Sequence, residues 1–315
     1  MSVLHGPEDG KPRFCRFHVL TFLPESANCP PQKAVMKVTK AVITAAGDNH
    51  SSLPLQNVVD REGRPGTALR RTLDEVVNAG IEEVAVIVRP GQSQPYVDAA
   101  EAHASRLVFF EQDSPRGYGD AILRAGSFVE GQPFLHLVSD HLYVSRSDKS
   151  CAAQLCEVAE QHECAVSAIQ ATRENEIVFF GTVGGTPVPR HDGLYEVSTV
   201  IEKPTPTVAE QELVVAGQRA GHYLCLFGMH VLTPGILELL QESLDAAEAG
   251  ATIDLSSSLA KLAQSEQYLA FEVDGQRFNT SYRYGLLLAQ LAITLGGVDR
   301  DLLLTELVRQ LAQDS

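Results

Sequence analysis

Four short apolar runs alternate with helical segments along the first half of this chain, and this alternation constrains its fold most. The runs are residues 41–46, 84–88, 107–110 and 134–138. Between the first two, Thr67 is suited to cap a helix that carries apolar residues on one face and stops at Gly80. A strand, a helix and a strand form a βαβ unit, so the pattern predicts an open, mostly parallel sheet with helices on both faces.

The pattern changes in the second half of the chain. Three apolar segments follow one another with Gly, Pro and Asp turns and no helix between them: residues 179–183, 195–201 and 223–232. Consecutive strands without crossover helices predict an antiparallel insertion packed against the open sheet. Helices are expected again near the end of the chain: residues 234–247, 255–264 and 284–295.

We expect one folded domain, residues 36–295, with a further segment at each end. Residues 1–35 hold five prolines and no sustained period, which predicts a poorly ordered leader. The functional chain is expected to begin at Met36, and an intact mass that includes the leader would contradict this. Residues 296–315 predict an amphipathic helix, whose leucine stripe either packs on its own domain or makes a homo-oligomer contact.

Charge and composition exclude several classes of protein. The 315 residues include 25 Lys and Arg against 40 Asp and Glu, a net charge of −15, so nucleic acid is not an expected partner. No stretch approaches the roughly 20 apolar residues that a membrane helix needs, and no signal-peptide pattern is seen. The six cysteines lack C-x-x-C spacing, and we expect reduced thiols in a cytoplasmic protein.

Small residues follow the first and third predicted strands, at the sheet edge where open α/β folds bind ligands. Three follow the first strand: Ala45, Ala46 and Gly47. They are small enough for a phosphate or base to approach the backbone, although packing alone also explains them. After the third strand, Gly117 and Gly119 precede a helix, and the amide of Gln112 both donates and accepts, as a pyrimidine edge requires. An ordinary turn is the alternative for this loop.

Charged residues follow two other predicted strands. Asp140 ends the fourth strand, where a carboxylate either holds Mg²⁺ over a phosphate or caps a turn; the sequence leaves both open. We discount His141, because neighbours on an extended chain point to opposite sides. Lys203 is suited to hold a phosphate and Glu202 to accept hydrogen bonds from sugar hydroxyls, with a solvated strand end as the alternative.

Taken in order, these residues resemble the sugar-1-phosphate nucleotidyltransferases, and most closely the UTP–glucose-1-phosphate uridylyltransferase branch. The resemblance spans residues 40–295 and is carried by short motifs: Lys40–Gly47, Asn78–Val84, Gln112 with Gly117 and Gly119, Asp140, Phe180–Val183, Glu202–Pro204, Phe227–Leu232 and Ile253–Ser256. It implies a Rossmann-like, GT-A-like sheet with an antiparallel sugar-binding insertion. It also implies that a sugar 1-phosphate attacks the α-phosphorus of a nucleoside triphosphate and that pyrophosphate leaves.

The resemblance assigns roles to these residues. The expected nucleotide-binding residues are Ala45, Ala46, Gly47, Gln112, Gly117 and Gly119. The expected sugar-binding residues are Gly181, Glu202 and Lys203. Lys203 and Asp140 are the expected catalytic residues, and Mg²⁺ is expected at Asp140 and Asn279. UTP is the expected nucleotide, with dTTP as the alternative, and glucose 1-phosphate is the expected sugar.

Two parts of the pattern depart from the family. Counting from Gly47, the loop G-x-G-T-R reads Asn49, His50 and Ser51 in its last three positions, so serine replaces the catalytic arginine. Asn279 replaces the second metal-binding aspartate, and its amide oxygen carries no charge. Each electrostatic donor lost at a charged transition state costs about 3–4 kcal/mol.

Four downstream arginines are candidates to replace the lost charge: Arg61, Arg64, Arg70 and Arg71. We expect Arg70 and Arg71 to be committed to the helix. Arg61 and Arg64 flank Gly63, where the chain can move, and the sequence leaves open whether they do. Two hypotheses therefore stand. One is an enzyme that makes a nucleotide sugar; the other is a catalytically degenerate relative that binds a nucleotide sugar in a regulatory or scaffold role.

Overall fold

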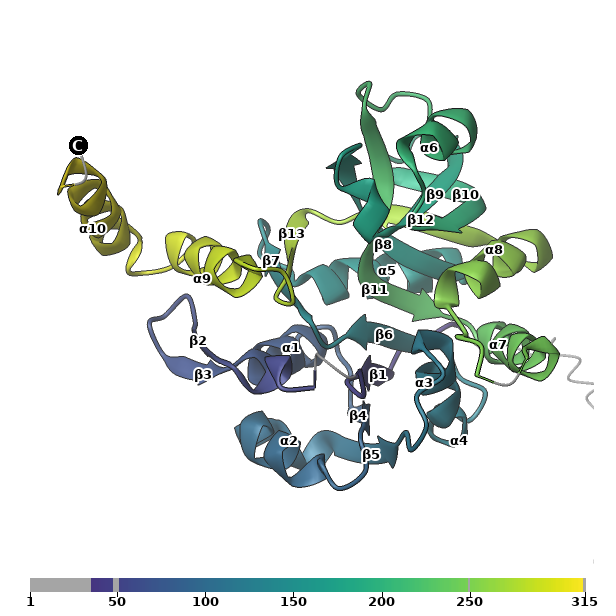
Figure 1. Cartoon of the computed structure of the whole chain (residues 1–315), viewed down its shortest axis with the longest axis horizontal. Coiled ribbons are helices and arrows are strands. Elements are labelled where there is room, and N and C mark those ends of the chain that lie inside the picture. The colour runs from purple at the N-terminus through teal and green to yellow at the C-terminus, as the bar shows by residue number, and fades with distance from the viewer. Residues whose placement is uncertain (1–34, 48–50, 249, 314–315) are drawn as a thin grey trace, which may run out of the picture. The chain divides into compact units, whose positions relative to one another are not determined.

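A nine-stranded mixed sheet runs through the part of the chain described by the computed structural model, residues 35–47, 51–248 and 250–313 (Figure 1). The chain divides into two units, residues 1–34 and 35–315, and the sheet belongs to the second. The predicted leader up to residue 34 lies outside the described residues.

The predicted parallel half of the sheet is confirmed. Its strands are β1 (Lys40–Thr44), β4 (Glu83–Val88), β5 (Leu107–Glu111) and β6 (Phe134–Val138). They lie in the order β5-β4-β1-β6, and every neighbouring pair is parallel. The strands β1, β4 and β6 are buried on both faces, which explains why their segments read as continuous apolar runs, whereas the edge strand β5 is partly exposed.

Helices cover both faces of the sheet, as β1 itself shows. Ile43 joins one buried cluster with Leu73 of α1 (Ala68–Val77), whereas its neighbour Val42 joins another with Ile122 of α3 (Tyr118–Arg124). Successive strand residues point to opposite faces, so a single strand feeds both layers of the core. The cap of α1 forms as expected, because the Oγ1 atom of Thr67 accepts the Arg70 backbone N–H at 3.1 Å.

The other helices confirm the predicted segments and add several short ones. Those of the core and the C-terminal region are α2 (Ser93–Ala100), α4 (Gly126–Val129), α5 (Cys151–His162), α6 (Pro206–Glu212), α7 (Gly235–Ala246), α8 (Leu255–Ser265), α9 (Gly285–Leu295) and α10 (Arg300–Gln313). Three are short 3-10 helices: η1 (Leu53–Leu55), η2 (Glu101–Arg106) and η3 (Ile177–Phe179). The sequence patterns did not indicate α2 or α6.

The antiparallel insertion is present, but it continues the same sheet instead of packing against it. Its strands are β9 (Gly181–Pro187), β10 (Leu194–Glu202) and β11 (His222–Leu232). The same half of the sheet contains β8 (Ala165–Arg173) and β12 (Tyr268–Glu272), which pair parallel with each other. The strand β11 pairs antiparallel with β6 on one side and with β8 on the other. The β6 edge would otherwise leave buried backbone groups unpaired, and the ladder to β11 satisfies them.

Two small ribbons of paired strands lie outside the large sheet. The strands β2 (Asn57–Val59) and β3 (Pro65–Thr67) form a hairpin within the long connection after β1. The strands β7 (His141–Ser145) and β13 (Gly275–Asn279) pair although they are far apart in sequence, and Asn279 lies opposite His141. Neither ribbon was predicted from the sequence.

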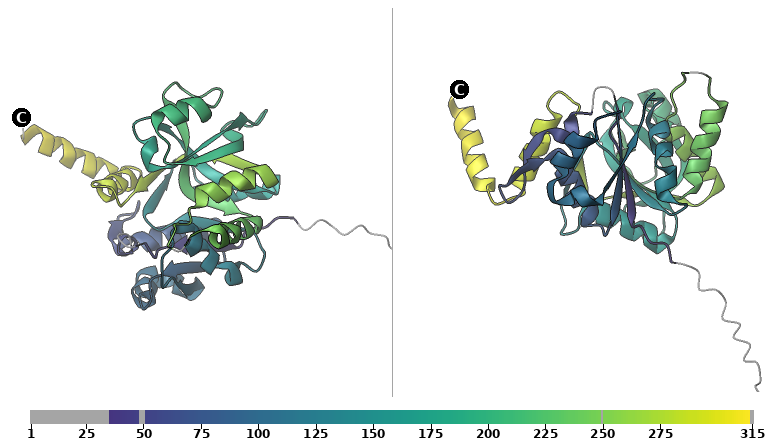
Figure 2. Two further views of the ribbon diagram at one scale, coloured as in Figure 1. Left: turned by 45° about the vertical axis from the view of Figure 1, so that its right-hand side comes forward. Right: turned by 90° about the horizontal axis from the view of Figure 1, so that it is seen from below.

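The C-terminal helix α10 extends from the sheet region beyond α9 in all three views (Figures 1 and 2). Its leucine stripe is half-buried at Leu303 and Leu304 and exposed at Val308 and Leu311, and none of its described residues is buried. The homo-oligomer contact stays a prediction. No helix within residues 35–47, 51–248 and 250–313 is long and apolar enough to cross a membrane.

We expect Leu73→Ala to lower the free energy of unfolding by about 2–5 kcal/mol, because it empties a fully buried position between α1 and the sheet. Urea denaturation measures this loss. The matched control is Leu302→Ala on α10, where the leucine is 64% exposed and the same deletion should change stability by less than about 0.5 kcal/mol. Equal losses for the two variants would contradict this description of the core.

Candidate functional site

A cavity of about 680 Å³ lies where several strands of the large sheet end. Nine of the residues expected to form a site line it: Ala46, Gly47, Gln112, Gly117, Asp140, Gly181, Glu202, Lys203 and Asn279. They come from the C-terminal ends of β1, β5, β6 and β10, from the start of β9 and from β13. The structure therefore brings together residues that are widely separated in sequence.

Two expected residues lie outside this lining. Ala45 is buried, and its carbonyl accepts the hydroxyl of Tyr96 at 3.4 Å. The N–H of Gly119 donates to the carbonyl of Ile253 at 2.9 Å, and a Cβ at this position would meet the Leu240 side chain at 2.6 Å. Glycine at 119 is thus required for close packing of α3.

Gly117 does line the cavity, and its conformation requires glycine. Its φ is +97°, in the region that L-residues rarely adopt, and a Cβ would meet the Thr252 side chain at 2.5 Å. The helix α3 begins at the next residue.

Gln112 follows β5 with its side-chain amide held in one orientation. Its Nε2 atom donates to the Asp120 carboxylate at 2.6 Å and lies 3.4 Å from the Gly117 carbonyl. A carboxylate only accepts, so Nε2 must face Asp120, and the amide oxygen is the acceptor that remains for a ligand. The sequence indicated Gln112 but not its orienting partner.

Asp140 lies in the turn between β6 and β7, beside His141. The Nδ1 atom of His141 is 2.8 Å from a carboxylate oxygen of Asp140, and both residues line the cavity. The expectation that His141 points to the opposite side from Asp140 was therefore wrong. The reason is that the chain turns at residues 139–140, so the alternation of an extended strand does not apply there.

Asn279 faces the cavity with its amide oxygen already engaged. This oxygen accepts the backbone N–H of Ser281 at 2.8 Å and also the Ser281 hydroxyl. A backbone N–H can only donate, so the oxygen must face Ser281 and the NH₂ group takes the other side. These bonds occupy the atom that a cation would need.

Glu202 ends β10, Lys203 follows it, and both line the cavity. A carboxylate oxygen of Glu202 accepts the Ser256 hydroxyl at 2.6 Å, and the other lies 3.6 Å from Lys203 Nζ. Lys203 has a φ of +48°, and its backbone N–H donates to the Phe180 carbonyl. Its side chain is 59% exposed, so the ammonium group is accessible to a ligand.

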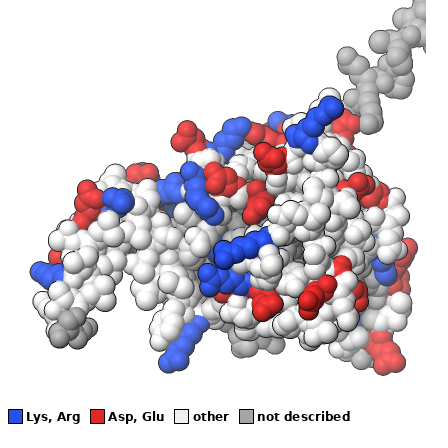
Figure 3. Space-filling view, turned by 90° about the horizontal axis from the view of Figure 1, so that it is seen from above, with Lys and Arg blue, Asp and Glu red and all other residues white. Residues whose placement is uncertain are grey.

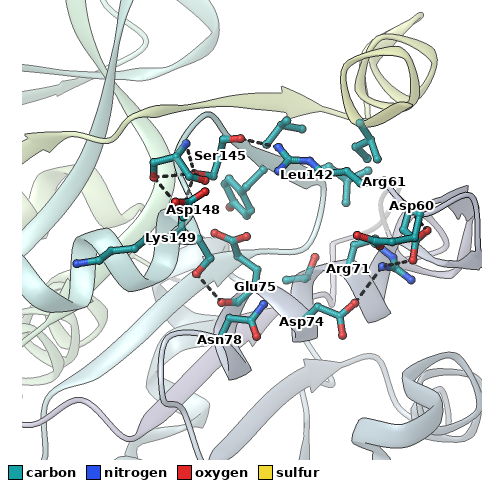
Figure 4. A pocket seen from close by; sticks show the side chains of 17 residues that line it. Asp60, Arg61, Arg71, Asp74, Glu75, Asn78, Leu142, Ser145, Asp148 and Lys149 are labelled. Carbon is teal, nitrogen blue, oxygen red and sulfur yellow. Dashed lines mark hydrogen bonds and ion pairs between the residues drawn. The ribbon is translucent and has the colours of Figure 1, made fainter. Parts of the chain in front are cut away.

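The four candidate arginines are held away from this cavity, two of them in a smaller cavity of about 230 Å³ beside α1 (Figure 4). There Arg61 donates to the Ser145 carbonyl, and Arg71 pairs with Asp74 at 3.1 Å and Asp60 at 3.3 Å. The other two pair with nearby acids, Arg64 with Asp60 and Arg70 with Glu101. In this structure neither Arg61 nor Arg64 lines the larger cavity.

The larger cavity is therefore poor in positive charge. Of the described Lys and Arg residues, only Lys203 lines it, against the carboxylates of Asp140, Glu202 and Asp254. On the molecular face in Figure 3, basic and acidic side chains are interspersed, with no broad surface of one sign. Next to this lining, Arg89 donates from Nε to the Ala46 carbonyl at 3.3 Å.

Glu75 lies at the centre of the smaller cavity (Figure 4). Burial raises the pKa of this carboxyl to about 7, although the backbone N–H groups of Ala152 and Cys151 favour its ionised form. The folded state therefore holds the Glu75 proton more tightly than the unfolded chain does.

We expect the stability gained from protonated Glu75 to be present below about pH 4.5 and to be lost as pH rises through 7, by roughly 1–3 kcal/mol. Urea denaturation across this range measures the slope. Glu75→Gln, which keeps the neutral form, should flatten it, whereas Glu82→Gln on the exposed surface should not. If Glu75→Gln left the pH dependence of the unfolding free energy unchanged, the raised pKa assigned to Glu75 would be contradicted.

Comparison with known proteins adds a family and several relatives. A family model described as nucleotidyl transferase matches residues 64–277. A UTP–glucose-1-phosphate uridylyltransferase of Streptococcus pneumoniae is 27% identical over 280 residues, covering 80% of this chain and 88% of the relative. A second protein of that name, from Streptococcus pyogenes, is 26% identical with 80% and 87% coverage.

Solved structures agree with the fold. A UDP-glucose pyrophosphorylase from Acinetobacter baumannii superposes with a TM-score of 0.68 at 21% identity, covering 87% of this chain and 99% of its own. A UDP-glucose pyrophosphorylase complexed with UDP-glucose gives 0.66 at 20% identity, with 81% and 98% coverage. At this identity the likeness establishes the mixed α/β architecture.

Proposed function

The chain belongs to the nucleotidyl transferase family, and from that premise we propose that it transfers a uridylyl group from UTP to glucose 1-phosphate. The products are UDP-glucose and pyrophosphate. One observation carries the proposal: Gln112, Asp140 and Lys203 lie at three strand ends and line a single cavity. The relatives named as uridylyltransferases support the choice of substrates.

The nucleotide is assigned to the side of the cavity formed by β1, β5 and the start of α3. Ala46, Gly47 and Gly117 offer backbone that a ligand can approach closely, because none carries a side chain larger than methyl. The amide oxygen of Gln112, fixed by Asp120, suits the ring N–H of a pyrimidine. Uracil and thymine share this group, so dTTP stays the alternative.

The sugar phosphate is assigned to the opposite side. Glu202, held by Ser256, is placed to accept hydrogen bonds from sugar hydroxyls. A Cβ at Gly181 would meet Glu202 Oε2 at 3.0 Å and Ser256 Oγ at 2.8 Å, so glycine keeps this wall open. Lys203 provides the positive charge for a phosphate.

Mg²⁺ is the proposed cofactor, with Asp140 as its protein ligand. Within the described ranges no group of three or more His, Cys, Asp or Glu forms a metal site, and the Asn279 oxygen is engaged by Ser281. A single carboxylate fits a cation that also binds the substrate's phosphates, as Mg²⁺ usually does. When bound, Mg²⁺ neutralises phosphate charge. Asn279 is then proposed to shape the turn beside this site.

The alternative, a degenerate relative that binds a nucleotide sugar in a regulatory or scaffold role, is favoured by one observation. None of Arg61, Arg64, Arg70 and Arg71 lines the larger cavity. In-line phosphoryl transfer depends on charge neutralisation more than on a base, so a cavity with one protein cation is suited to slow turnover.

A cytoplasmic location is proposed from the reduced thiols. The four described cysteines are buried and free, and burial raises the pKa of the Cys156 and Cys164 thiols to about 12. They are therefore unreactive packing residues.

We expect UDP-glucose with Mg²⁺ to raise the melting temperature, and pyrophosphate to be released from UTP and glucose 1-phosphate. At a ligand concentration of 100 times Kd, binding adds about 2.7 kcal/mol to stability. Thermal shift and a coupled pyrophosphate assay measure the two effects. A shift without pyrophosphate would support the degenerate alternative, and no shift with UTP, dTTP or UDP-glucose would contradict both.

A second prediction concerns residues 51 and 279, where this chain lacks the charged side chains of the family pattern. Ser51→Arg with Asn279→Asp should raise the rate of pyrophosphate release by at least about 100-fold, because each restored electrostatic group contributes about 3 kcal/mol at the transition state. The matched control is Asn57→Asp, the same chemical change on an exposed residue of β2. A double variant no faster than the parent would show that these positions do not limit the rate.

A further inference from the structure

Two buried histidines meet at the floor of the larger cavity, and the proposed reaction gives neither a role. His136 on β6 and His230 on β11 are paired across the strands, and their rings stack with centroids 5.9 Å apart. His136 is fully buried and His230 is 2% exposed, but His230 lines the cavity together with Thr44 and Tyr118.

A bulge in β11 lies directly before His230. The register to β8 shifts between Leu226 and His230, and Gly228 within this stretch has a φ of +80°. A Cβ at Gly228 would meet the Val138 side chain at 2.7 Å. Bulges next to binding sites re-aim side chains, and here the re-aimed residue lines the cavity.

A chain of hydrogen bonds leads to His230 from beneath the floor. The Tyr268 hydroxyl lies 2.5 Å from the Ser167 hydroxyl oxygen, which lies 2.5 Å from Nδ1 of His230. Tyr268 is 1% exposed, and Ser167 is its hydrogen-bond partner among the described residues. A buried phenol hydrogen without an acceptor is costly, so Tyr268 donates to Ser167.

The direction of the bond from Tyr268 to Ser167 determines the direction of the next bond and the tautomer of His230. A serine hydroxyl has one hydrogen and can accept two hydrogen bonds. Among the described residues its oxygen contacts Tyr268 and Nδ1 of His230. Since Tyr268 donates, Nδ1 is the acceptor left for the buried serine hydrogen, and Ser167 donates to it. The ring hydrogen of neutral His230 is then on Nε2. Burial lowers the pKa of His230 to about 3 and the pKa of the adjacent His136 well below its usual range, so both rings are neutral at physiological pH.

We propose that His230 is a specificity-determining residue whose Nε2–H donates to a hydroxyl oxygen of the bound nucleotide sugar. The proposal rests on the proposed function. His230 shares the cavity lining with Tyr118, which follows Gly117 on the nucleotide side, and with Leu226, whose side chain lies next to Gly181 on the sugar side. A neutral donor matches an uncharged hydroxyl of either the ribose or the hexose, whereas the phosphates are assigned to Lys203 and Asp140.

Nuclear magnetic resonance tests the tautomer directly, without any ligand. Long-range ¹H–¹⁵N correlations of the histidine rings should show His230 as the neutral Nε2–H form between about pH 5.5 and 8. Ser167→Ala removes the donor to Nδ1 and should populate the Nδ1–H form. A wild-type His230 that is cationic or carries its hydrogen on Nδ1 would overturn the inference, whether or not the protein binds a nucleotide.

Calorimetric titration tests recognition with UTP, 2′-deoxy-UTP and UDP-glucose. His230→Phe should weaken binding about 10-fold, whereas His230→Gln, which keeps a neutral N–H donor, should recover most of the affinity. The matched control is His222→Phe at the other end of β11, outside the cavity lining, and it should bind as the wild type does. Melting temperatures of the variants check that each is folded.

The set of ligands whose affinity falls in His230→Phe shows whether the hydroxyl belongs to the ribose or to the hexose. In the phenylalanine variant, a contact to the ribose 2′-hydroxyl weakens UTP and UDP-glucose but not 2′-deoxy-UTP, and a contact to the ribose 3′-hydroxyl weakens all three. A hexose contact weakens UDP-glucose alone. Equal affinities of wild type and His230→Phe for all three ligands would overturn the inference and leave the proposed function intact. A wild-type protein that binds none of the three would overturn both.

Discussion

The parallel pairing of β1 with β4 and β6 is the constraint on which the site depends. Parallel neighbours end at the same edge of the sheet, so the loops after β1, β5 and β6 emerge together. Gly47, Gln112 and Asp140 are the residues in those loops, and all three line one cavity. Because β1, β4 and β6 are buried on both faces, a slip in their register would be costly, and the core holds the loops that follow β1 and β6 in place.

The second half of the site comes from an antiparallel extension of the same sheet. The strand β11 continues the ladder from β6 and so brings the insertion against the parallel half. The end of β10 then supplies Glu202 and Lys203, while the ribbon of β7 and β13 supplies Asn279. The resulting cavity is rich in neutral and acidic groups and has one described lysine in its lining. It is therefore well equipped to recognise a ligand by hydrogen bonds, but it offers little positive charge to neutralise phosphates.

Much of this arrangement could be predicted from the sequence, because the signals were local. Apolar runs identified the strands, Thr67 identified the start of α1, and the polar residues after each strand identified Gln112 and Asp140. His141 was misjudged because the turn at residues 139–140 depends on how β7 pairs with β13, a contact between distant segments.

Non-local contacts explain the other differences as well. Gly119 is required by packing against Leu240 and Ile253, which no spacing around residue 119 reveals. The orientation of Gln112 depends on Asp120 in the first turn of α3, and the chain of hydrogen bonds from Tyr268 to His230 joins three different strands. Such contacts become visible only when the sheet order is known.

Hydrogen–deuterium exchange with and without UDP-glucose tests the central claim most directly, namely that these separate strand ends form one ligand site. The account predicts that the ligand slows backbone exchange together in the loops around Gln112, Asp140 and Lys203. Protection confined to one of these loops, or found instead around the smaller cavity beside α1, would contradict it.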